Sequence, residues 1–516
     1  MKIIVRVLAI VVLFIHIGDG ARILGIVPTP SISHQVVFQP LWRELSLRGH
    51  QVTTITTDPI KDPTLTNLTE IDLHFSYEAW NKIIMKNILA FNDNPIRGIL
   101  GFVEQGLDIT DQQLRHPSMQ SFLKSEDKFD LAIIESVAPV MIAFAEKFQC
   151  PFISMTSMDG FTYLYKSMGN PTHPVLFPDS IYPYYEKMSL AQRLGSVIST
   201  NVMSIMIAYS SFSQDQLVKK YFGENYPSVQ HLMNNASLLF VNSDPILHKI
   251  RPLVPTVVQI GGGSHLRKPK PLPHDLKEKL DNEKNGFIYF SLGSNVKSKD
   301  IPMETRTTIL ETFSELPYTV LWKFEAENLS NKPDNVIISK WLPQQDVLRH
   351  PNIKLFITQG GLQSSDETIH IGVPIVGMPF FGDQAANIKR MVAKGMGLSV
   401  EYTALEKNDF KAKILEIIQN PKYRNRVKEL AALAQDQPMT GLERAIWWSE
   451  YVIRHKGAAH LRSPLLDIPW YQYLLLDVIA VLLFGFTFST YILYILVRSL
   501  LRLIRRNLND NEKKLK

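Results

Sequence analysis

The segment from Phe356 to Gln384 (FITQGGLQSSDETIHIGVPIVGMPFFGDQ) holds two sets of residues that could bind one polar ligand. An apolar run ends at Gly360 and Gly361, and a polar stretch of helical character follows. Glycines let backbone N–H groups approach a ligand, and a helix start after such a turn is an anion site. Asp383 and Gln384 follow the next apolar run, where open α/β sheets bind ligands. The segment therefore predicts an anion site and a polar pair around one bound molecule.

An interpretation without a ligand is open for part of this segment. Ser364 and Glu367 have the spacing of a capping box, in which two side chains satisfy the first turn of a helix. A capping box does not account for Asp383 and Gln384, so the segment as a whole favours a ligand.

His34 is a candidate general base. It stands at a predicted helix start in the loop PTPSISH, where the helix dipole disfavours the imidazolium and keeps the ring available to take a proton. A lone histidine at a helix start is more often structural, so its position alone leaves both interpretations open.

The elements that must position these residues alternate between strands and helices. In residues 21–261 the pattern predicts a helix from about His34 to Arg48 and strands at 23–27, 51–57, 131–135 and 152–155. This alternation favours an α/β fold with a parallel sheet covered by helices on both faces. Residues 188–213 are apolar with helical character. Core packing is favoured for them, with an apolar pocket or the bilayer surface as alternatives.

A linker and a second α/β series follow. The stretch GGGSHLRKPKPLPHD, residues 261–275, is rich in Gly, Pro and Lys and is typical of a linker. Strands are then predicted at 286–292, 320–324, 354–358 and 374–378. Two doubly wound domains joined by one linker leave a cleft between them.

The two ends of the chain differ from the globular part. Residues 1–20 have Lys2 and Arg6 flanking an apolar run, which favours a secretory signal over a buried strand. Residues 478–497 carry no charge and are long enough to cross a hydrocarbon core of roughly 30 Å as a helix, with a buried core helix as the alternative. Aromatic residues before this span and arginines after it predict a cytosolic tail and a lumenal body.

These features divide the chain into seven parts. They are a signal peptide (1–20), an N-terminal domain (21–261), a linker (262–283), a C-terminal domain (284–437), a helical segment leading to the membrane (438–473), a transmembrane helix (474–497) and a cytosolic basic tail (498–516). The positive charge lies at the ends, so nucleic acid is excluded as a partner. Cys150 is the only cysteine, which excludes an internal disulfide and a cysteine-based metal site. Sequons at Asn67, Asn235 and Asn328 agree with a lumenal body and predict glycosylation.

The segment from Phe356 to Gln384 resembles the signature of the UDP-glycosyltransferases, in particular the membrane-bound animal UDP-glucuronosyl/glucosyltransferases with invertebrate-like character. The motifs FSLGSN (290–295) and WLPQQDVLRHP (341–351), the early His34, the signal, the late membrane span and the lysine pair near the C-terminus agree with it. The resemblance covers essentially the whole chain. It implies the GT-B fold, two facing Rossmann-like domains with a C-terminal transmembrane helix. The acceptor would be held by the N-terminal domain and the donor by the C-terminal domain.

The resemblance also implies roles for individual residues. Trp341 would stack on uracil, Gln344 would contact the nucleoside and Glu367 would hold the ribose hydroxyls. Asp383 and Gln384 would hold sugar hydroxyls. The diphosphate would be surrounded by the Gly361 turn and by Ser294, Gln359, Gln363 and Ser364. Gln359 stands where many members have His, and it offers an N–H donor without a charge.

In the family an aspartate pairs with the histidine at position 34, and Glu135 stands at the matching position. The extra methylene puts the geometry of the His34–Glu135 pair in doubt. If the pair works, it activates an acceptor hydroxyl and the sugar is transferred with inversion. The chain has no Asp-x-Asp motif, so we expect neither a metal nor another cofactor, with helix N–H groups stabilising the leaving diphosphate.

The sequence therefore predicts an inverting UDP-hexosyltransferase that uses UDP-glucose and acts on hydroxyl groups of small lipophilic acceptors. The lysines at 513 and 514 resemble a retrieval signal, which predicts a single-pass type I protein of the endoplasmic reticulum membrane with a lumenal body. The implied partners are the UDP-sugar, the acceptor and the membrane, and a homo-oligomer is compatible with them. The alternative is an inactive UDP-sugar and lipophile-binding protein of the same fold.

Overall fold

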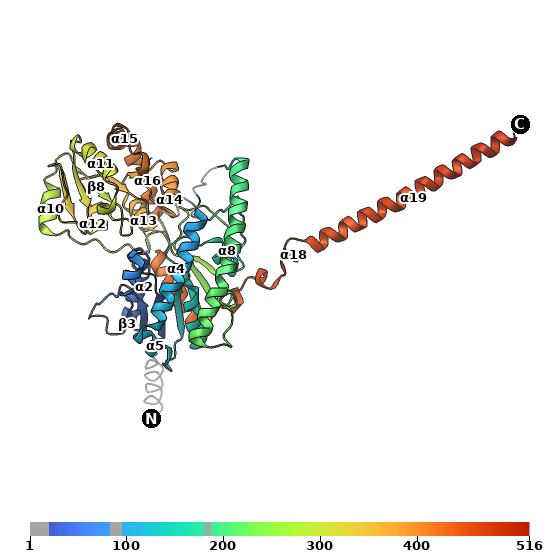
Figure 1. Ribbon diagram of the computed structural model, residues 1–516, viewed down its shortest axis with the longest axis horizontal. Coiled ribbons are helices and arrows are strands. Elements are labelled where there is room, and N and C mark those ends of the chain that lie inside the picture. The colour runs from blue at the N-terminus through green and yellow to red at the C-terminus, as the bar shows by residue number, and fades with distance from the viewer. Residues whose placement is uncertain (1–19, 83–94, 180–181, 183–186, 515–516) are drawn as a thin grey trace, which may run out of the picture. The chain divides into compact units, whose positions relative to one another are not determined.

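Figure 1 shows the computed structural model of the chain, which describes residues 20–82, 95–179, 182 and 187–514. By its internal contacts the chain divides into two compact units, one ending at Arg462 and one running from Ser463 onward. The predicted signal peptide falls, apart from Gly20, outside the described residues.

The first unit contains two sheets, and the first sheet has seven parallel strands in the order β3-β2-β1-β4-β5-β6-β7. The strands are β1 (Arg22–Val27), β2 (Gln51–Thr56), β3 (Leu68–Asp72), β4 (Leu131–Glu135), β5 (Phe152–Thr156), β6 (Leu238–Val241) and β7 (Val257–Gln259). Apolar runs such as β4 and β5 are buried along their whole length, because helices cover both faces of a parallel sheet. The four strands predicted in this part are confirmed to within one residue.

Helices connect these strands. They are α2 (Ile32–Leu47), α4 (Pro95–Arg115), α5 (Pro117–Leu123), α6 (Ala143–Lys147), α7 (Thr162–Ser167), α8 (Leu190–Phe222) and α9 (Val229–Asn234), with a 3₁₀ turn η1 (Pro139–Ile142) before α6. The predicted helix 34–48 corresponds to α2, which begins two residues earlier.

The second sheet has six parallel strands in the order β10-β9-β8-β11-β12-β13. They are β8 (Phe287–Ser291), β9 (Thr319–Lys323), β10 (Val336–Ser339), β11 (Ile353–Thr358), β12 (Ile375–Gly377) and β13 (Gly397–Ser399). Its helical elements are α10 (His274–Asp281), η2 (Ser298–Asp300), α11 (Met303–Ser314), α12 (Gln344–Leu348), α13 (Leu362–Ile371), α14 (Gln384–Ala393), η3 (Tyr402–Ala404), α15 (Lys407–Gln419) and α16 (Pro421–Gln435). The four strands predicted in this part also match to within one residue.

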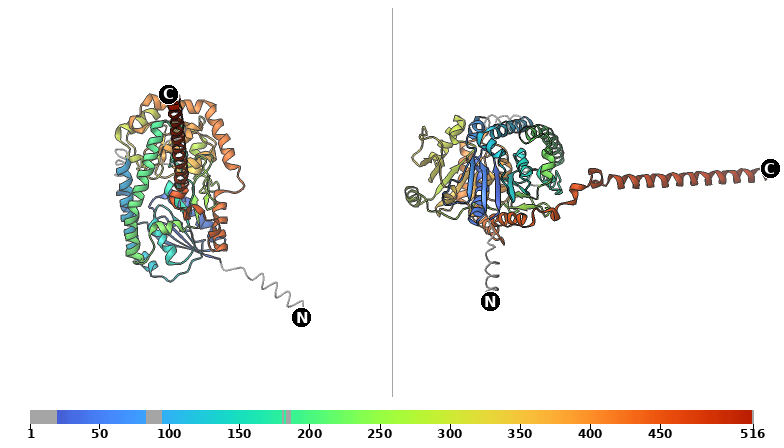
Figure 2. Two further views of the ribbon diagram at one scale, coloured as in Figure 1. Left: turned by 90° about the vertical axis from the view of Figure 1, so that its right-hand side faces the viewer. Right: turned by 90° about the horizontal axis from the view of Figure 1, so that it is seen from below.

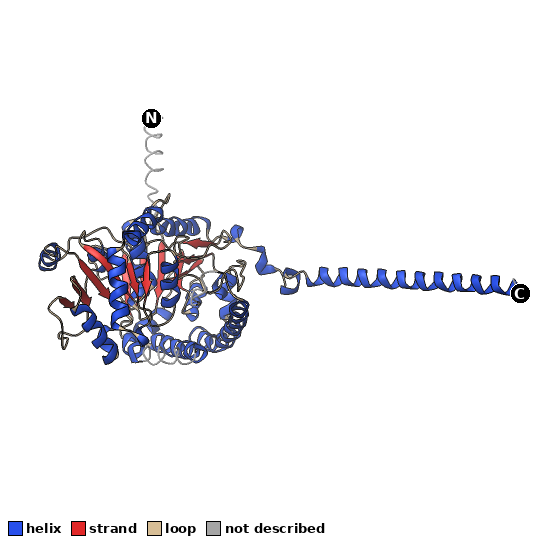
Figure 3. Ribbon diagram, turned by 90° about the horizontal axis from the view of Figure 1, so that it is seen from above, coloured by secondary structure: helices blue, strands red, loops and turns tan. Residues whose placement is uncertain are grey.

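Each sheet has a hydrophobic core on both faces, and Figure 3 shows the strands enclosed by helices. In β1, Ile23 and Val27 belong to one core, whereas Leu24 and Ile26 belong to the core on the other face. This division follows from the alternation of side chains along a strand.

The helix α17 (Gly441–His455) returns to the first sheet, and η4 (Ala459–Leu461) follows it. Ala445, Ile446 and Val452 of α17 are buried in the same core as Ile23 of β1, and α17 contacts α2. The segment expected to lead to the membrane therefore first packs against the N-terminal half. The predicted domain boundaries remain predictions.

The long helix α8 differs from the prediction of core packing for residues 188–213. Leu194, Ile198, Ile205 and Phe212 are exposed, so that prediction is wrong for much of the segment. α8 lies beside α4, as Figures 1 and 2 show, and its Met203 lines a cavity. One face of α8 thus lines the cavity, and the other is exposed at the surface.

The second unit consists of η5 (Pro464–Asp467), α18 (Trp470–Tyr473) and α19 (Leu476–Lys514). Of the helices in the described part of the chain, α19 is the one that is long and apolar enough to cross a membrane. It contains nearly all of the predicted span, residues 474–497.

Candidate functional site

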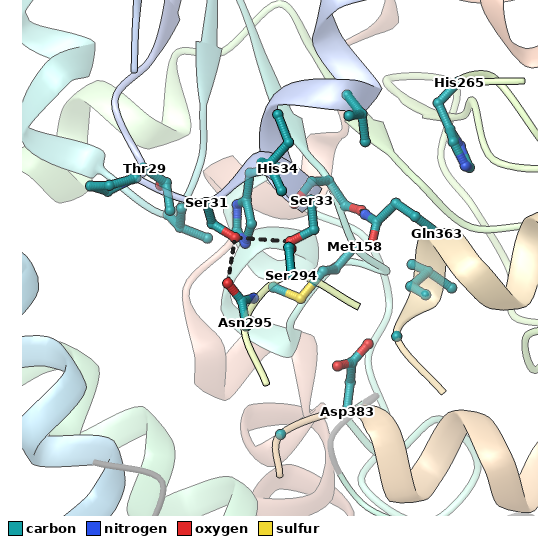
Figure 4. A pocket seen from close by; sticks show the side chains of 18 of the residues that line it. Thr29, Ser31, Ser33, His34, Met158, His265, Ser294, Asn295, Gln363 and Asp383 are labelled. Carbon is teal, nitrogen blue, oxygen red and sulfur yellow. Dashed lines mark hydrogen bonds between the residues drawn. The ribbon is translucent and has the colours of Figure 1, made fainter. Parts of the chain in front are cut away.

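A cavity of about 1160 Å³ lies between the two halves of the first unit. Its walls include the segments after β1 and β4 from the first sheet, and the end of β9 and the segments after β8, β10, β11 and β12 from the second. These are the carboxyl ends of parallel strands, where α/β sheets bind ligands. Figure 4 shows side chains from both halves on the walls.

His34 and Glu135 meet at this cavity. His34 is the third residue of α2, and Glu135 is the fully buried last residue of β4. The His34 Nδ1 atom lies 2.5 Å from Glu135 Oε1, so the extra methylene of glutamate does not prevent the pair. Glu135 Oε2 accepts from the Thr29 hydroxyl at 2.6 Å and from the Thr29 N–H at 3.3 Å. Because Glu135 occupies Nδ1, the Nε2 atom of His34 is left to act on a substrate.

Asp130, at the opposite end of β4, is not part of the pair. Its Oδ2 atom accepts a hydrogen bond from the Arg22 N–H at the start of β1. A strand places its first and last residues at opposite ends of the sheet, which excludes Asp130 as the partner of His34.

The turn before α13 lets neighbouring groups approach its backbone closely. Gly360 has φ +85°, a conformation that favours glycine, and a Cβ atom there would lie 2.4 Å from Ile388. Gly361 is the N-cap of α13, and no side chain caps this helix. The first N–H groups of α13 are therefore left for a ligand at the cavity wall.

Ser364 and Glu367 do not form the capping box that their spacing allows. Gln344 Nε2 donates to Ser364 Oγ at 2.9 Å and to Glu367 Oε2 at 2.6 Å. Gln345 Nε2 donates to Glu367 Oε1 at 3.0 Å. Both glutamines belong to α12, so a contact between two helices replaces the local cap and holds the Glu367 carboxylate at the cavity.

The polar pair after β12 also lies on the wall. Gln384 Oε1 accepts from the N–H groups of Phe380 and Phe381, which leaves its Nε2 group to donate to a ligand. Asp383 accepts from Asn387 at 2.8 Å. Burial raises the pKa of the Asp383 carboxyl, although Asn387 and Arg390 counteract the rise.

Trp341 is 66% exposed although it lines the cavity, so it is not the ordinary buried tryptophan that would need no ligand. The Lys323 Nζ atom lies 5.7 Å from its ring centroid. An exposed indole face beside Gln344 offers a flat surface for a planar group.

Ser294, Gln359 and Gln363 complete the set of predicted donor residues on the wall. Gln363 Nε2 donates to the Ser157 carbonyl in the first half at 3.1 Å. Gln359 is buried, and its Oε1 atom has no partner among the described residues. The cavity wall thus brings together eleven of the twelve predicted catalytic and donor residues, and the twelfth, Glu135, is buried behind His34.

Sequence reasoning missed further residues of the site. Tyr289 donates to Gln344 Oε1 at 3.1 Å, and the Ser31 hydroxyl donates to Asn295 Oδ1 at 3.2 Å, between the two halves (Figure 4). His265, which lines the cavity, lies in a stretch that resembles a solvated linker. Asn295 could have been found, since it ends the motif FSLGSN, whereas Tyr289 gives no signal beyond a strand position.

The predicted sequons lie at the surface to different degrees. Asn235 and Asn328 are exposed, and Asn67 is partly exposed. Their glycosylation remains a prediction.

Solved glycosyltransferases share this architecture. The kitacinnamycin glycotransferase aligns with a TM-score of 0.56 over 84% of this chain and 99% of its own, at 18% identity. The glycosyltransferase VinC in complex with DTDP aligns with a TM-score of 0.55 over 84% of this chain and 100% of its own, at 15% identity. Together with the two parallel sheets, these likenesses show that the chain has the GT-B fold, with two Rossmann-like domains.

Residues 24–514 match the family model of UDP-glucoronosyl and UDP-glucosyl transferase, and the chain belongs to this family. It is similar to UDP-glycosyltransferase UGT5 of Dactylopius coccus, at 35% identity over 98% of this chain and 96% of that protein. It is also similar to an ecdysteroid UDP-glucosyltransferase of Spodoptera littoralis nuclear polyhedrosis virus, at 32% identity over 96% of this chain and 100% of that protein. UDP-glucuronosyltransferase 2B7 of Homo sapiens is 30% identical over 87% of this chain and 88% of its own length. The protein is a UDP-sugar-dependent glycosyltransferase.

Proposed function

We propose that this protein transfers glucose from UDP-glucose, with inversion, to a hydroxyl group of a small lipophilic acceptor. The observation that carries the proposal is the His34–Glu135 pair at 2.5 Å, whose histidine lies on the wall of a cavity that is also lined by the predicted donor residues. A binding protein without turnover would not need a buried carboxylate on a histidine at this place.

His34 acts as the general base in this proposal. Glu135 holds the proton on Nδ1, so Nε2 carries the lone pair that removes the acceptor's proton as the new bond forms. The carboxylate then stabilises the imidazolium. The hydroxyl attacks the anomeric carbon opposite the leaving UDP, and an α-linked donor gives a β-glycoside.

The donor residues bind UDP-glucose from one end to the other. Trp341 stacks on uracil, Gln344 contacts the nucleoside and Glu367 accepts from the ribose hydroxyls. The Gly361 turn and the α13 N-terminus hold the diphosphate, with Ser294, Gln359, Gln363 and Ser364 around it. The Asp383 carboxylate and the Gln384 amide bind hydroxyls of the sugar.

Charge on the cavity wall favours glucose over glucuronic acid. Of the four Arg and Lys side chains that line the cavity in the described part of the chain, three are already ion-paired. These pairs are Arg43–Asp62, Arg267–Asp346 and Lys323–Glu325. Asp383 would repel a sugar carboxylate, whereas a neutral hexose offers it a hydroxyl.

The acceptor is lipophilic because the wall on the side of the first sheet is apolar. Its residues come from α4, η1, α8, α9 and the loop after β5, and include Leu107, Ile109, Val140, Phe161, Met203 and Met233. Burying an apolar molecule here would gain about 25 cal/mol for each Å² removed from water. Attachment of glucose then makes the product more soluble.

The apolar helix α19 supports the proposal that the protein is anchored in the endoplasmic reticulum membrane as a single-pass type I protein. The lumenal orientation follows from the basic tail after the span.

The test is UDP release by microsomes that express the chain, supplied with UDP-glucose and a panel of phenols. Acceptor-dependent release should disappear in His34→Ala and persist in His231→Ala, a control at an exposed histidine of α9. Equal release by wild type and His34→Ala would refute the proposed base. UDP-glucose binding without release from either would favour the inactive binding protein.

A further inference from the structure

His265 is a buried histidine without a hydrogen-bonding partner. It lies in the linker after Gly263, and its side chain is 1% exposed. Neither ring nitrogen has a hydrogen-bond partner among the described residues. The Nε2 atom lies 3.5 Å from Glu367 Oε1, close enough for an ion pair. Figure 4 shows the ring on the cavity wall. A polar ring that loses its water without a partner costs stability, so its placement needs a reason.

The reason is the concentration of acidic groups around it. Asp366 and Glu367 are neighbours on α13 and both are buried. Burial, together with the Asp244 and Glu367 carboxylates, raises the pKa of Asp366 to about 7, although His265 counteracts the rise. Burial by itself would lower the pKa of His265, but the Glu367 and Asp366 carboxylates raise it above its ordinary value. The imidazolium is therefore favoured at this place.

The other basic groups near the cluster do not supply this charge. His370, on the same helix, uses Nδ1 for the Asp366 carbonyl, and burial lowers its pKa. Arg267, two residues after His265, is paired with Asp346 at 2.5 Å. Gln344 and Gln345 reach the Glu367 oxygens, but their amides are neutral.

We propose that His265, as an imidazolium, is a positioning residue that holds the Glu367 carboxylate through their 3.5 Å contact and directs it at the ribose hydroxyls of the UDP-sugar. This inference rests on the proposed donor site at Glu367. Without His265, the buried Glu367 carboxylate would lose its cationic contact and keep only the neutral amides of Gln344 and Gln345 to orient it.

The experiment compares the affinities for UDP and 2′-deoxy-UDP, measured by calorimetry on the full-length membrane protein. A hydroxyl bonded to a charged group contributes enough for wild type to prefer UDP by roughly 10- to 100-fold. His265→Gln should reduce this preference by at least about fivefold, because the weakened group is the one that binds the hydroxyl. His370→Asn, a matched change at a second buried histidine, should weaken or preserve both affinities equally.

Glu367→Gln separates failure of the inference from failure of the donor site. A preference that survives in Glu367→Gln overturns the ribose site, and with it the role of His265. A preference that is lost in Glu367→Gln but kept in His265→Gln overturns the role of His265 alone. The wild-type preference should also fall as the pH rises from about 6 to about 9, since the imidazolium loses its proton. A flat wild-type profile overturns the inference even if His265→Gln does not fold.

Discussion

The Glu135→Gln substitution should abolish transfer more completely than its small change in shape suggests. The reason is the environment of the second carboxylate oxygen. Glu135 Oε2 accepts two hydrogen bonds from Thr29, through the hydroxyl at 2.6 Å and the N–H at 3.3 Å. A glutamine must place its oxygen toward these two donors. Its NH₂ group then faces Nδ1 of His34, where Glu135 Oε1 now lies.

This orientation selects the wrong tautomer of His34. An N–H group facing Nδ1 makes Nδ1 the acceptor, so the ring proton moves to Nε2, the atom that must take the acceptor's proton. Loss of the correct tautomer in a carboxylate–histidine pair costs about 10⁴-fold in kcat, or about 5 kcal/mol. We expect Glu135→Gln to lower kcat by about 10³- to 10⁴-fold, close to the level of His34→Ala.

The assay is acceptor-dependent UDP release at saturating UDP-glucose, with UDP affinity as the control for an intact donor site. Adding Thr29→Ala should partly rescue Glu135→Gln, by up to about tenfold, because only the weaker N–H donor then fixes the amide. Retention of activity within about threefold of wild type in Glu135→Gln would refute the assignment of Glu135 as the group that sets the tautomer.

Three further predictions concern the donor and the buried charges. Trp341→Ala should weaken UDP binding about tenfold in calorimetry while leaving Tm unchanged, because the exposed indole stacks on the base without supporting a core; a drop in Tm with unchanged affinity would contradict this role. EDTA should leave the rate of UDP release unchanged, since no step of the proposed mechanism requires a metal, and loss of activity restored by added Mg²⁺ would refute it. Asp366 has its pKa raised to about 7 in the folded protein, so its protonated form is favoured and stability should fall as the pH rises from about 4 to about 7. Asp366→Asn should flatten that part of the profile of Tm against pH, and an unchanged slope would show that Asp366 is not its source.

The sequence predicted the strands well because their signals are local. Apolar runs such as β4 and β8 are buried along their whole length and bounded by polar loops, so their limits follow from composition. Asp383 and Gln384 followed from the same regularity, since residues at the ends of parallel strands meet at one edge. Glu135 and most of the donor residues instead came from the resemblance to the family, which left the geometry of the His34–Glu135 pair open.

Features that depend on contacts far apart in the chain could not be predicted. The doubt about Glu135 concerned one methylene, and Thr29, 106 positions away, resolves it by holding the second oxygen. The exposed apolar face of α8 has the composition of a core helix, so only its place in the fold reveals the difference. The return of α17 to the first sheet likewise depends on the whole chain.

His265 shows why composition misleads at a functional site. The stretch around it is rich in Gly, Pro and Lys, which is typical of a solvated linker, yet its side chain is almost fully buried. The glycines that suggest flexibility instead allow the turn that carries the ring inward, since Gly262 and Gly263 have φ of +78° and +83°.

The two histidine–carboxylate contacts at the cavity require opposite charge states of the histidine ring. At His34 the ring must be neutral to remove a proton, and the Glu135 carboxylate supports the charge that appears only during transfer. At His265 the ring is proposed to be charged throughout, so that it holds the neighbouring Glu367 carboxylate in place while that group binds a neutral ribose. Exchanging the two environments would impair both steps, because a permanently protonated His34 cannot act as a base. Both carboxylates accept hydrogen bonds from the protein, but Glu135 lies behind His34 and does not line the cavity, whereas Glu367 is part of its wall. This difference in access supports the proposed roles, in which the first pair transfers a proton and the second binds the ligand.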